Sequence, residues 1–321
     1  MPSKCRIISD STCDFTAQHA KERDVTIVPL HYSEPGKPDG GLHGDDDLFQ
    51  SISAHDFYDA MRHGACPSTA QVSAYEYTQM FQECYDNGDA AVFFTLSSGI
   101  SGTYECGANA LEQFKAQHPD EEVRIYVVDS GVASTAFTLF LDGACDMRDA
   151  GLNAEQLVAW AEDAKFNVHT VFMVDNLEAL HRGGRVPKSV AVVGDALDVK
   201  PILHFNLDGS LGICAVSRGR RKGLRKLIDT YERKHDDSYF GQRVCIGDAD
   251  VPDDGYQVAS ELKSHYPDLQ VSRPSIGPTI GCHVGPGMVS CCFWGADRRG
   301  EKQGGKVKGV REVKNPPASQ K

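Results

Sequence analysis

Apolar runs of strand length alternate with helical patterns in the first half of the chain. Strands are predicted at residues 6–9, 25–30, 90–96 and 123–129. Helices are predicted at residues 15–23, 102–117, 133–148 and 154–165. In the second of these helices Tyr104, Ala108, Leu111 and Phe114 recur near helical spacing. Strand–helix–strand units of this spacing predict a parallel sheet with helices on both faces.

The second half of the chain has a different pattern. Strands are predicted at residues 171–174, 199–205, 211–216 and 243–247 and near Leu269 and Met288. Asn206, Asp208 and Gly209 predict a hairpin, and helices are predicted at residues 219–234 and 254–264. A hairpin combined with crossover helices implies a mixed sheet. The predicted fold class is therefore two-domain α/β, with an N-terminal parallel α/β/α sheet in residues 1–165 and a C-terminal mixed-sheet α/β domain in residues 166–296.

Two segments have few of the apolar residues that a packed element needs. Residues 33–47 are rich in Gly, Pro and Asp, which predicts a mobile loop. Residues 297–321 are polar and rich in Lys and Gly, which predicts a disordered basic tail. This tail carries 8 basic and 3 acidic side chains, or +5, so residues 1–296 carry −17 of a net charge of −12. Because phosphate contacts need a dense basic face, no nucleic-acid partner is expected.

Composition narrows the class of protein further. The chain has 321 residues, of which 40% are hydrophobic and 24% charged, as is ordinary for a globular protein of two domains. It has neither an apolar run of about 18 residues nor the pattern of a signal peptide near residue 1. Its 11 cysteines are therefore expected to be free thiols, which favours the cytoplasm. Without a G-x-G-x-x-G, P-loop or C-x-x-C motif, neither a cofactor nor a metal is expected.

Four polar clusters stand out in the first half, and three of them directly follow predicted strands. They occupy residues 9–15, 68–77, 95–104 and 127–134. The carboxyl ends of parallel strands meet at one crevice, where ligands bind. The alternative is that these side chains cap the next helix, which suits Ser11, Thr12 and Asp14. Ser97 and Ser98 together exceed what one helix cap needs, and therefore favour a binding site.

The second half adds three clusters, at residues 177–186, 199–211 and 275–287. Arg185 follows two glycines at a tight turn near a helix end, where a protein carboxylate, a C-cap or a ligand are its alternative partners. His283 lies in a Gly-rich stretch with little side-chain bulk, which favours a polar group presented to a ligand over a core histidine. The basic run 217–226 predicts either a solvated helix face or a patch for an anion or an acidic partner.

Taken in order, these clusters resemble the DegV family of bacterial fatty-acid-binding proteins over about residues 4–295. The most specific pieces are SSGISGTY, LHRGGRV, VKPIL followed by DGSL, and GPTIGCHVGPG. The resemblance implies two α/β domains with a lipid between them, and a carrier that is not an enzyme. It implies that the carrier presents a long-chain fatty acid to a dihydroxyacetone-kinase-like fatty acid kinase and holds the acyl-phosphate for phospholipid synthesis. It also leaves room for transient contact with a membrane.

The resemblance further assigns a carboxylate site. The residues it implies for binding the fatty-acid carboxylate are Thr69, Ser98, Arg185 and His283. A protonatable His283 is expected to accommodate the charge that phosphorylation adds. Two alternatives from other classes stay open: a hydrolase of acyl substrates that uses Ser98 and His283, and an anion-binding regulator that uses the basic helix. The hydrolase lacks a G-x-S-x-G elbow around its serine.

Overall fold

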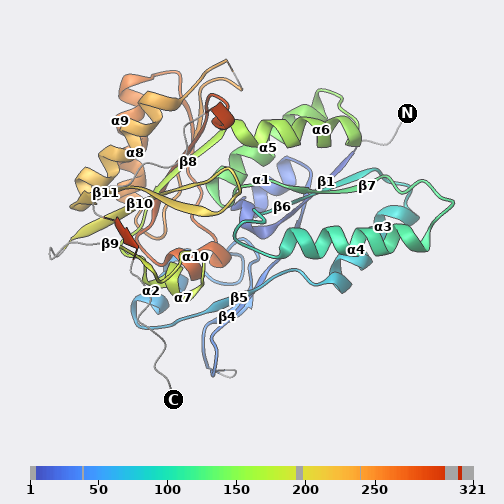
Figure 1. The fold of residues 1–321 in the computed structure, drawn as a ribbon, viewed down its shortest axis with the longest axis horizontal. Coiled ribbons are helices and arrows are strands. Elements are labelled where there is room, and N and C mark those ends of the chain that lie inside the picture. The colour runs from blue at the N-terminus through green and yellow to red at the C-terminus, as the bar shows by residue number, and fades with distance from the viewer. Residues whose placement is uncertain (1–4, 38–39, 193–197, 239, 301–309, 313–321) are drawn as a thin grey trace.

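The computed structural model describes residues 5–37, 40–192, 198–238, 240–300 and 310–312. Two main sheets lie side by side, and helix α5 (Thr135–Asp149) packs between them (Figure 1). None of the helices in these residue ranges is long and apolar enough to cross a lipid bilayer. The two sheets define the frame on which the candidate site is built.

The first sheet is parallel, with the strand order β2-β1-β6-β7. Its strands are β1 (Arg6–Asp10), β2 (Val25–Val28), β6 (Ala91–Thr95) and β7 (Ile125–Asp129). Alternation along the strands divides their side chains between two cores, so that Ile7 and Phe94 face one and Ile8 and Phe93 face the other. Besides α5, the helices of this part are α1 (Ala17–Glu22), α3 (Ala74–Asp86), α4 (Thr103–Gln117) and α6 (Ala154–Ala164). The predicted parallel sheet is confirmed.

The second sheet is mixed, with the strand order β11-β10-β8-β14-β12-β13. Its strands are β8 (Val168–Met173), β10 (Val199–Phe205), β11 (Leu211–Arg218), β12 (Arg243–Cys245), β13 (Gln270–Ser272) and β14 (Val289–Trp294). Only β12 and β13 pair in parallel. Helices α8 (Arg220–Lys234) and α9 (Pro252–His265) cover one face, and the other face packs towards α5 and the first sheet. The predicted mixed sheet is confirmed, whereas the exact domain boundary near residue 166 stays a prediction.

A third, small sheet corrects the prediction of a mobile loop at residues 33–47. Strands β3 (His31–Ser33) and β4 (His43–Asp45) form a hairpin, and β5 (Ser68–Ala70) pairs with the other edge of β3. The carboxylate of Asp46, directly after β4, is fully buried and anchors the returning strand. Three helices without a predicted counterpart lie near this sheet: α2 (Ala54–Arg62), α7 (Glu178–Arg182) and α10 (Pro278–Val284).

The prediction of a disordered tail from residue 297 is wrong in two places. Arg298–Gly300 forms a short 3-10 helix, in which the buried Arg298 donates to the carbonyl of Phe205 over 2.9 Å. Further on, β15 (Val310–Glu312) pairs antiparallel with β9 (Val190–Val192). The guanidinium of Arg298 thus pairs with Phe205, and the backbone of β15 pairs with β9. Composition alone does not reveal these contacts. The other residues of this predicted tail lie outside the described residues.

Candidate functional site: a cavity between the two sheets

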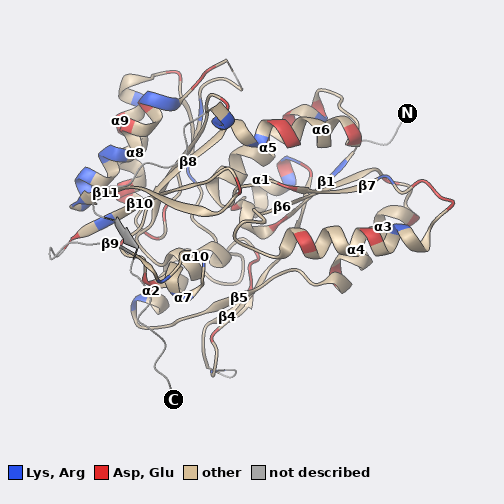
Figure 2. Cartoon of the chain, viewed as in Figure 1, with Lys and Arg blue, Asp and Glu red and all other residues tan. Residues whose placement is uncertain are grey.

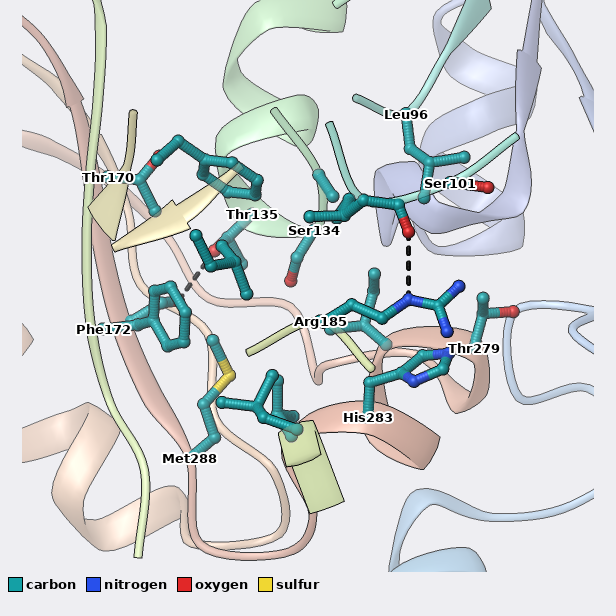
Figure 3. A pocket seen from close by; sticks show the side chains of 18 of the residues that line it. Leu96, Ser101, Ser134, Thr135, Thr170, Phe172, Arg185, Thr279, His283 and Met288 are labelled. Atoms are coloured by element: carbon teal, nitrogen blue, oxygen red, sulfur yellow. Dashed lines mark hydrogen bonds between the residues drawn. The ribbon is translucent and has the colours of Figure 1, made fainter. Parts of the chain in front are cut away.

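A cavity of about 630 Å³ lies between the two sheets and is lined by both halves of the chain (Figure 3). Its apolar wall includes Leu96 and Ile100 from the first half and Phe172, Phe205 and Met288 from the second. Small-molecule sites combine an apolar wall of this kind with a few placed polar groups. The cavity therefore suits an apolar ligand that has one polar end.

The polar end of the cavity joins three of the predicted residues. The Oγ1 atom of Thr69, on β5, lies 2.9 Å from Nε2 of His283, on α10. Arg185 lies beside His283, and its Nε donates to the carbonyl of Ile100 over 2.9 Å (Figure 3). A further N–H of Arg185 donates to the carbonyl of Gly183. Thr69, Arg185 and His283 thus meet in one cavity although 214 residues separate the first from the last.

His283 is uncharged at neutral pH in this arrangement. Burial and, to a lesser extent, the nearby charges of Arg185 and Arg182 together lower the pKa of its imidazole to about 3. Its Nδ1 atom has no hydrogen-bond partner among the described residues. The protonation of His283 that was expected beside a phosphorylated ligand stays a prediction. An anion bound between His283 and Arg185 would favour the charged imidazole and raise this pKa.

Ser98, the fourth predicted residue, does not line the cavity. Its hydroxyl donates to Oδ2 of Asp129 over 2.5 Å, and its backbone N–H donates to Oδ1 of the same carboxylate over 3.1 Å. Asp129 ends β7, next to the loop that follows β6, and so takes the serine away from the cavity. Ser101 of the same loop lines the cavity instead. The S-x-x-S spacing in SSGIS does not by itself reveal which hydroxyl points inwards.

Thr279 is a cavity residue that the sequence analysis missed. It is 2% exposed, and its side chain lies against the buried carboxylate of Asp46. It lies on α10 one turn before His283, and Figure 3 shows both side chains at the same end of the cavity. The only signal in the sequence is a hydroxyl residue in the motif GPTIG. Thr279 therefore adds a polar side chain to the lining of the cavity next to His283.

The sequence profile of the DegV family matches residues 4–295 of the chain. The chain belongs to the DegV family. A DegV domain-containing protein of Clostridium perfringens is 28% identical to it over 289 residues, which are 90% of this chain and 97% of that protein. The family predicted from the motifs is thus confirmed.

Solved structures show the same fold. A DegV lipid-binding protein of Thermotoga maritima is 25% identical, with a TM-score of 0.77, and the match covers 92% of this chain and 100% of that one. A stearic-acid-binding protein of Eubacterium ventriosum is 26% identical, with a TM-score of 0.76, and the match covers 90% of this chain and 97% of that one. The two-sheet α/β architecture is therefore that of DegV structures.

In this DegV protein, buried carboxylates from the first half hold the start of α10. Oδ1 of Asp14 accepts the N–H of Gly277 over 3.0 Å, and Oδ2 of Asp46 accepts the N–H of Thr279 over 3.1 Å. Asp14 also accepts the hydroxyl of Ser134, a cavity residue, over 2.5 Å. The predicted capping role of Asp14 thus applies to a helix more than 260 residues away rather than to the next one.

The pKa values of Asp14 and Asp46 are both raised. Burial is the main cause, and it raises the pKa of Asp46 to about 6 and that of Asp14 well above its usual value. Mutual repulsion adds to this effect, since each of the two lies near Asp10, whose pKa burial also raises to about 6. Three His, Cys, Asp or Glu side chains in a metal-binding arrangement do not occur among the described residues. Asp14 and Asp46 act on α10 through its backbone N–H groups.

Proposed function

We propose that this DegV protein binds one long-chain fatty acid in the cavity between its sheets, with the carboxylate at Arg185 and the acyl chain along the apolar wall. The observation that carries the proposal is the half-buried guanidinium of Arg185. Among the described residues, Arg185 donates only to backbone carbonyls and has no carboxylate partner. A cation that is withdrawn from water without a counter-ion is costly, and a ligand carboxylate would supply the missing charge.

The other polar residues fit the same ligand. Thr69, Ser101 and Thr279 offer hydroxyl groups at or near the guanidinium, and neutral His283 offers a ring N–H. We place Ser101 in the role first predicted for Ser98, because the hydroxyl of Ser98 is held by Asp129. Thr69, Arg185 and His283 keep their predicted roles as carboxylate-binding residues in this proposal.

Burial of the acyl chain supplies the affinity. A chain of about 16 carbons buried at about 0.8 kcal/mol per methylene gains about 12 kcal/mol before the costs of association. Those costs consume a large part of it and still leave room for tight binding. The relatives named above as lipid-binding and stearic-acid-binding support this ligand class. Carriage of a ligand, without a reaction on the protein itself, is the simplest use of such a site.

A hydrolase is not supported by the hydrogen bonds at the site. Such an enzyme needs its serine within reach of the histidine, with the histidine oriented by an acid. Here the hydroxyl of Ser98 donates to Asp129, Nε2 of His283 contacts Thr69, and Nδ1 of His283 has no partner among the described residues. The alternative of a Ser98–His283 hydrolase therefore has no nucleophile–base pair.

The fatty-acid proposal is tested by extraction of the purified protein and mass spectrometry of the extract, followed by uptake of palmitate into delipidated protein. We expect one acyl chain per protein chain, and palmitate that displaces a fluorescent fatty acid. An extract without a stoichiometric acyl chain, together with no uptake, would overturn the proposal. Recovery of a different stoichiometric ligand of anionic character would favour the regulator alternative instead.

The kinase partner is a further part of the proposal. Membership of the DegV family suggests that the bound fatty acid is presented to a dihydroxyacetone-kinase-like kinase and phosphorylated there. Lys and Arg residues, drawn blue, gather on α8, whereas red acidic segments mark α3, α4 and α6 (Figure 2). On α8, Arg220 pairs with Asp175 and Asp254 and is therefore not free. Arg221 and Lys222 are exposed and form no ion pair among the described residues, so they are the candidates for an acidic partner.

One experiment distinguishes fatty-acid binding from contact with the kinase. Arg221→Glu with Lys222→Glu should slow acyl-phosphate formation by an added kinase, and the salt dependence of that rate should weaken, because steering between charges depends on ionic strength. Fatty-acid affinity should stay unchanged, since neither side chain lines the cavity. Unaltered kinetics in this variant would exclude α8 as the kinase contact.

A further inference from the structure

A break in the second sheet lies at the far end of the cavity. Strands β8 and β10 pair only through Met173 with Ile202 and Phe172 with Leu203. Continued by two positions, this antiparallel register would place Thr170 opposite Phe205, yet these two residues do not pair. On its other edge β8 remains paired with β14 along its whole length, and β10 remains paired with β11 as far as Phe205. The strands therefore part at Thr170 and Phe205.

The buried Arg298 supplies a hydrogen bond where the two strands do not pair. Its guanidinium donates to the carbonyl of Phe205 over 2.9 Å, a backbone group that β8 leaves unpaired. A buried carbonyl without a partner is costly, so this bond stabilises the parted strands. The opening between β8 and β10 is thus a supported feature of the fold.

The cavity lies on one side of this opening, and a groove of about 1350 Å³ lies on the other. The groove is lined by α8, by residues of β10 and β11 such as Ile213, and by Leu207 in the turn between these two strands. Thr170 and Phe205 are the two residues that line both spaces. Phe205 is 6% exposed, so its ring fills the opening rather than lying on the surface. Figure 3 shows Thr170 across the cavity from Arg185 and His283, which places this wall at the end away from the carboxylate site.

We propose that Phe205 is the stop that limits the length of the acyl chain. The inference rests on the proposed function, since an acyl chain whose carboxylate is held at Arg185 extends towards this wall. Its methyl end meets the ring of Phe205, and the groove behind the ring is closed to it. Removal of the ring joins the cavity to the groove and lets longer chains pass between β8 and β10.

The test compares variants in their preference among saturated fatty acids of about 14 to 24 carbons, measured by displacement of a fluorescent fatty acid from delipidated protein. Phe205→Ala should move the optimum to longer chains and raise the affinity for the longest acids relative to palmitate by about tenfold, as expected for roughly two more buried methylenes. Leu207→Ala is the matched control, because Leu207 lines only the groove. Its length profile should equal that of the wild type.

Phe205→Leu keeps the opening partly filled and serves if Phe205→Ala does not fold; it should shift the profile in the same direction by less. An unchanged profile in a folded Phe205 variant, or an equal shift in Leu207→Ala, overturns the inference while leaving fatty-acid binding intact. A wild-type protein that takes up no fatty acid overturns the proposed function instead, and with it this inference.

Discussion

The two ends of α10 differ in how completely their polar groups are paired. At its start, the carboxylates of Asp14 and Asp46 accept N–H groups of Gly277 and Thr279. At its end, His283 has a ring nitrogen without a partner among the described residues, next to a guanidinium without a counter-ion. The backbone N–H groups of the first end are paired within the protein, whereas in the proposed function a ligand pairs with the groups of the second. Incomplete polar pairing, more than the presence of polar residues, therefore distinguishes the end proposed to bind the carboxylate.

The largest expected effect is at the incomplete end. Arg185→Gln should weaken fatty-acid binding by roughly 100-fold, since the charge and its hydrogen bonds to the carboxylate are lost. It should not lower the unfolding temperature, because it removes a half-buried cation that pairs with no carboxylate. Displacement titrations and thermal unfolding measure the two quantities.

A surface arginine provides the control for this prediction. Arg124→Gln changes an exposed side chain that donates only to the carbonyl of Gly88, so both affinity and stability should stay near those of the wild type. If Arg185→Gln instead unfolded the protein while the remaining folded fraction bound fatty acid normally, Arg185 would be a structural residue and the comparison between the two ends would fail.

The next largest effect is a loss of stability at the start of α10. Asp14→Ala leaves the N–H of Gly277 and the hydroxyl of Ser134 without their acceptor, and should lower the free energy of unfolding by about 2 kcal/mol. Asp45→Ala, at an exposed carboxylate of β4, should change stability by less than about 0.5 kcal/mol. Urea denaturation compares the two variants, and equal losses would show that Asp14 does not hold α10.

A smaller effect is expected at Gly183. A Cβ atom here would overlap Nδ1 of His283, while the φ of −73° at this residue suits alanine. Gly183→Ala should therefore displace the imidazole from Thr69 and weaken fatty-acid binding by about tenfold with little backbone strain. Gly40→Ala is the control, since nothing lies near its Cβ position. Binding that stays unchanged in Gly183→Ala would remove His283 from the carboxylate site.

The smallest effect is the change in stability with pH, which should have opposite signs for Asp46 at the start of α10 and for His283 at its end. Burial raises the pKa of Asp46 to about 6, so the folded protein keeps a proton that the unfolded chain releases near pH 4. The resulting stability is present below that window and is lost as the pH rises through 6. Burial lowers the pKa of His283 to about 3, so stability is lost as the pH falls from 6.5 towards 3.

Two variants measure these opposite slopes. The quantity is the free energy of unfolding at pH 5 minus that at pH 7, from urea denaturation. Relative to the wild type, it should fall by about 1 kcal/mol in Asp46→Asn and rise in His283→Gln. Asp120→Asn, at an exposed carboxylate that forms no ion pair among the described residues, should leave it unchanged. A shift of the same sign in both variants would contradict the assignment of these pKa changes to the two ends.

Local patterns account for most of the fold. The apolar runs at β1, β6 and β7 and the hairpin signal at Asn206 to Gly209 predicted the strands within a few residues, because burial on a sheet imposes a short period on the sequence. The motif order also indicated the family. The prediction of a mobile loop at residues 33–47 was wrong, since Gly, Pro and Asp suit a hairpin turn as well as a mobile loop, and only pairing with β5 distinguishes them.

Local pattern was enough to predict the two kinds of sheet, the family, and Thr69, Arg185 and His283 as candidates that the fold then brings together. Which serine of SSGIS faces the cavity could not be predicted in this way, because it depends on Asp129 of a neighbouring strand. The tertiary structure decided this, and it also decided that Asp14 caps a helix of the other half, and that β8 and β10 part at Phe205. Periodicity records whether a side chain is buried, whereas its partner depends on a segment far along the chain, and no local pattern carries that information.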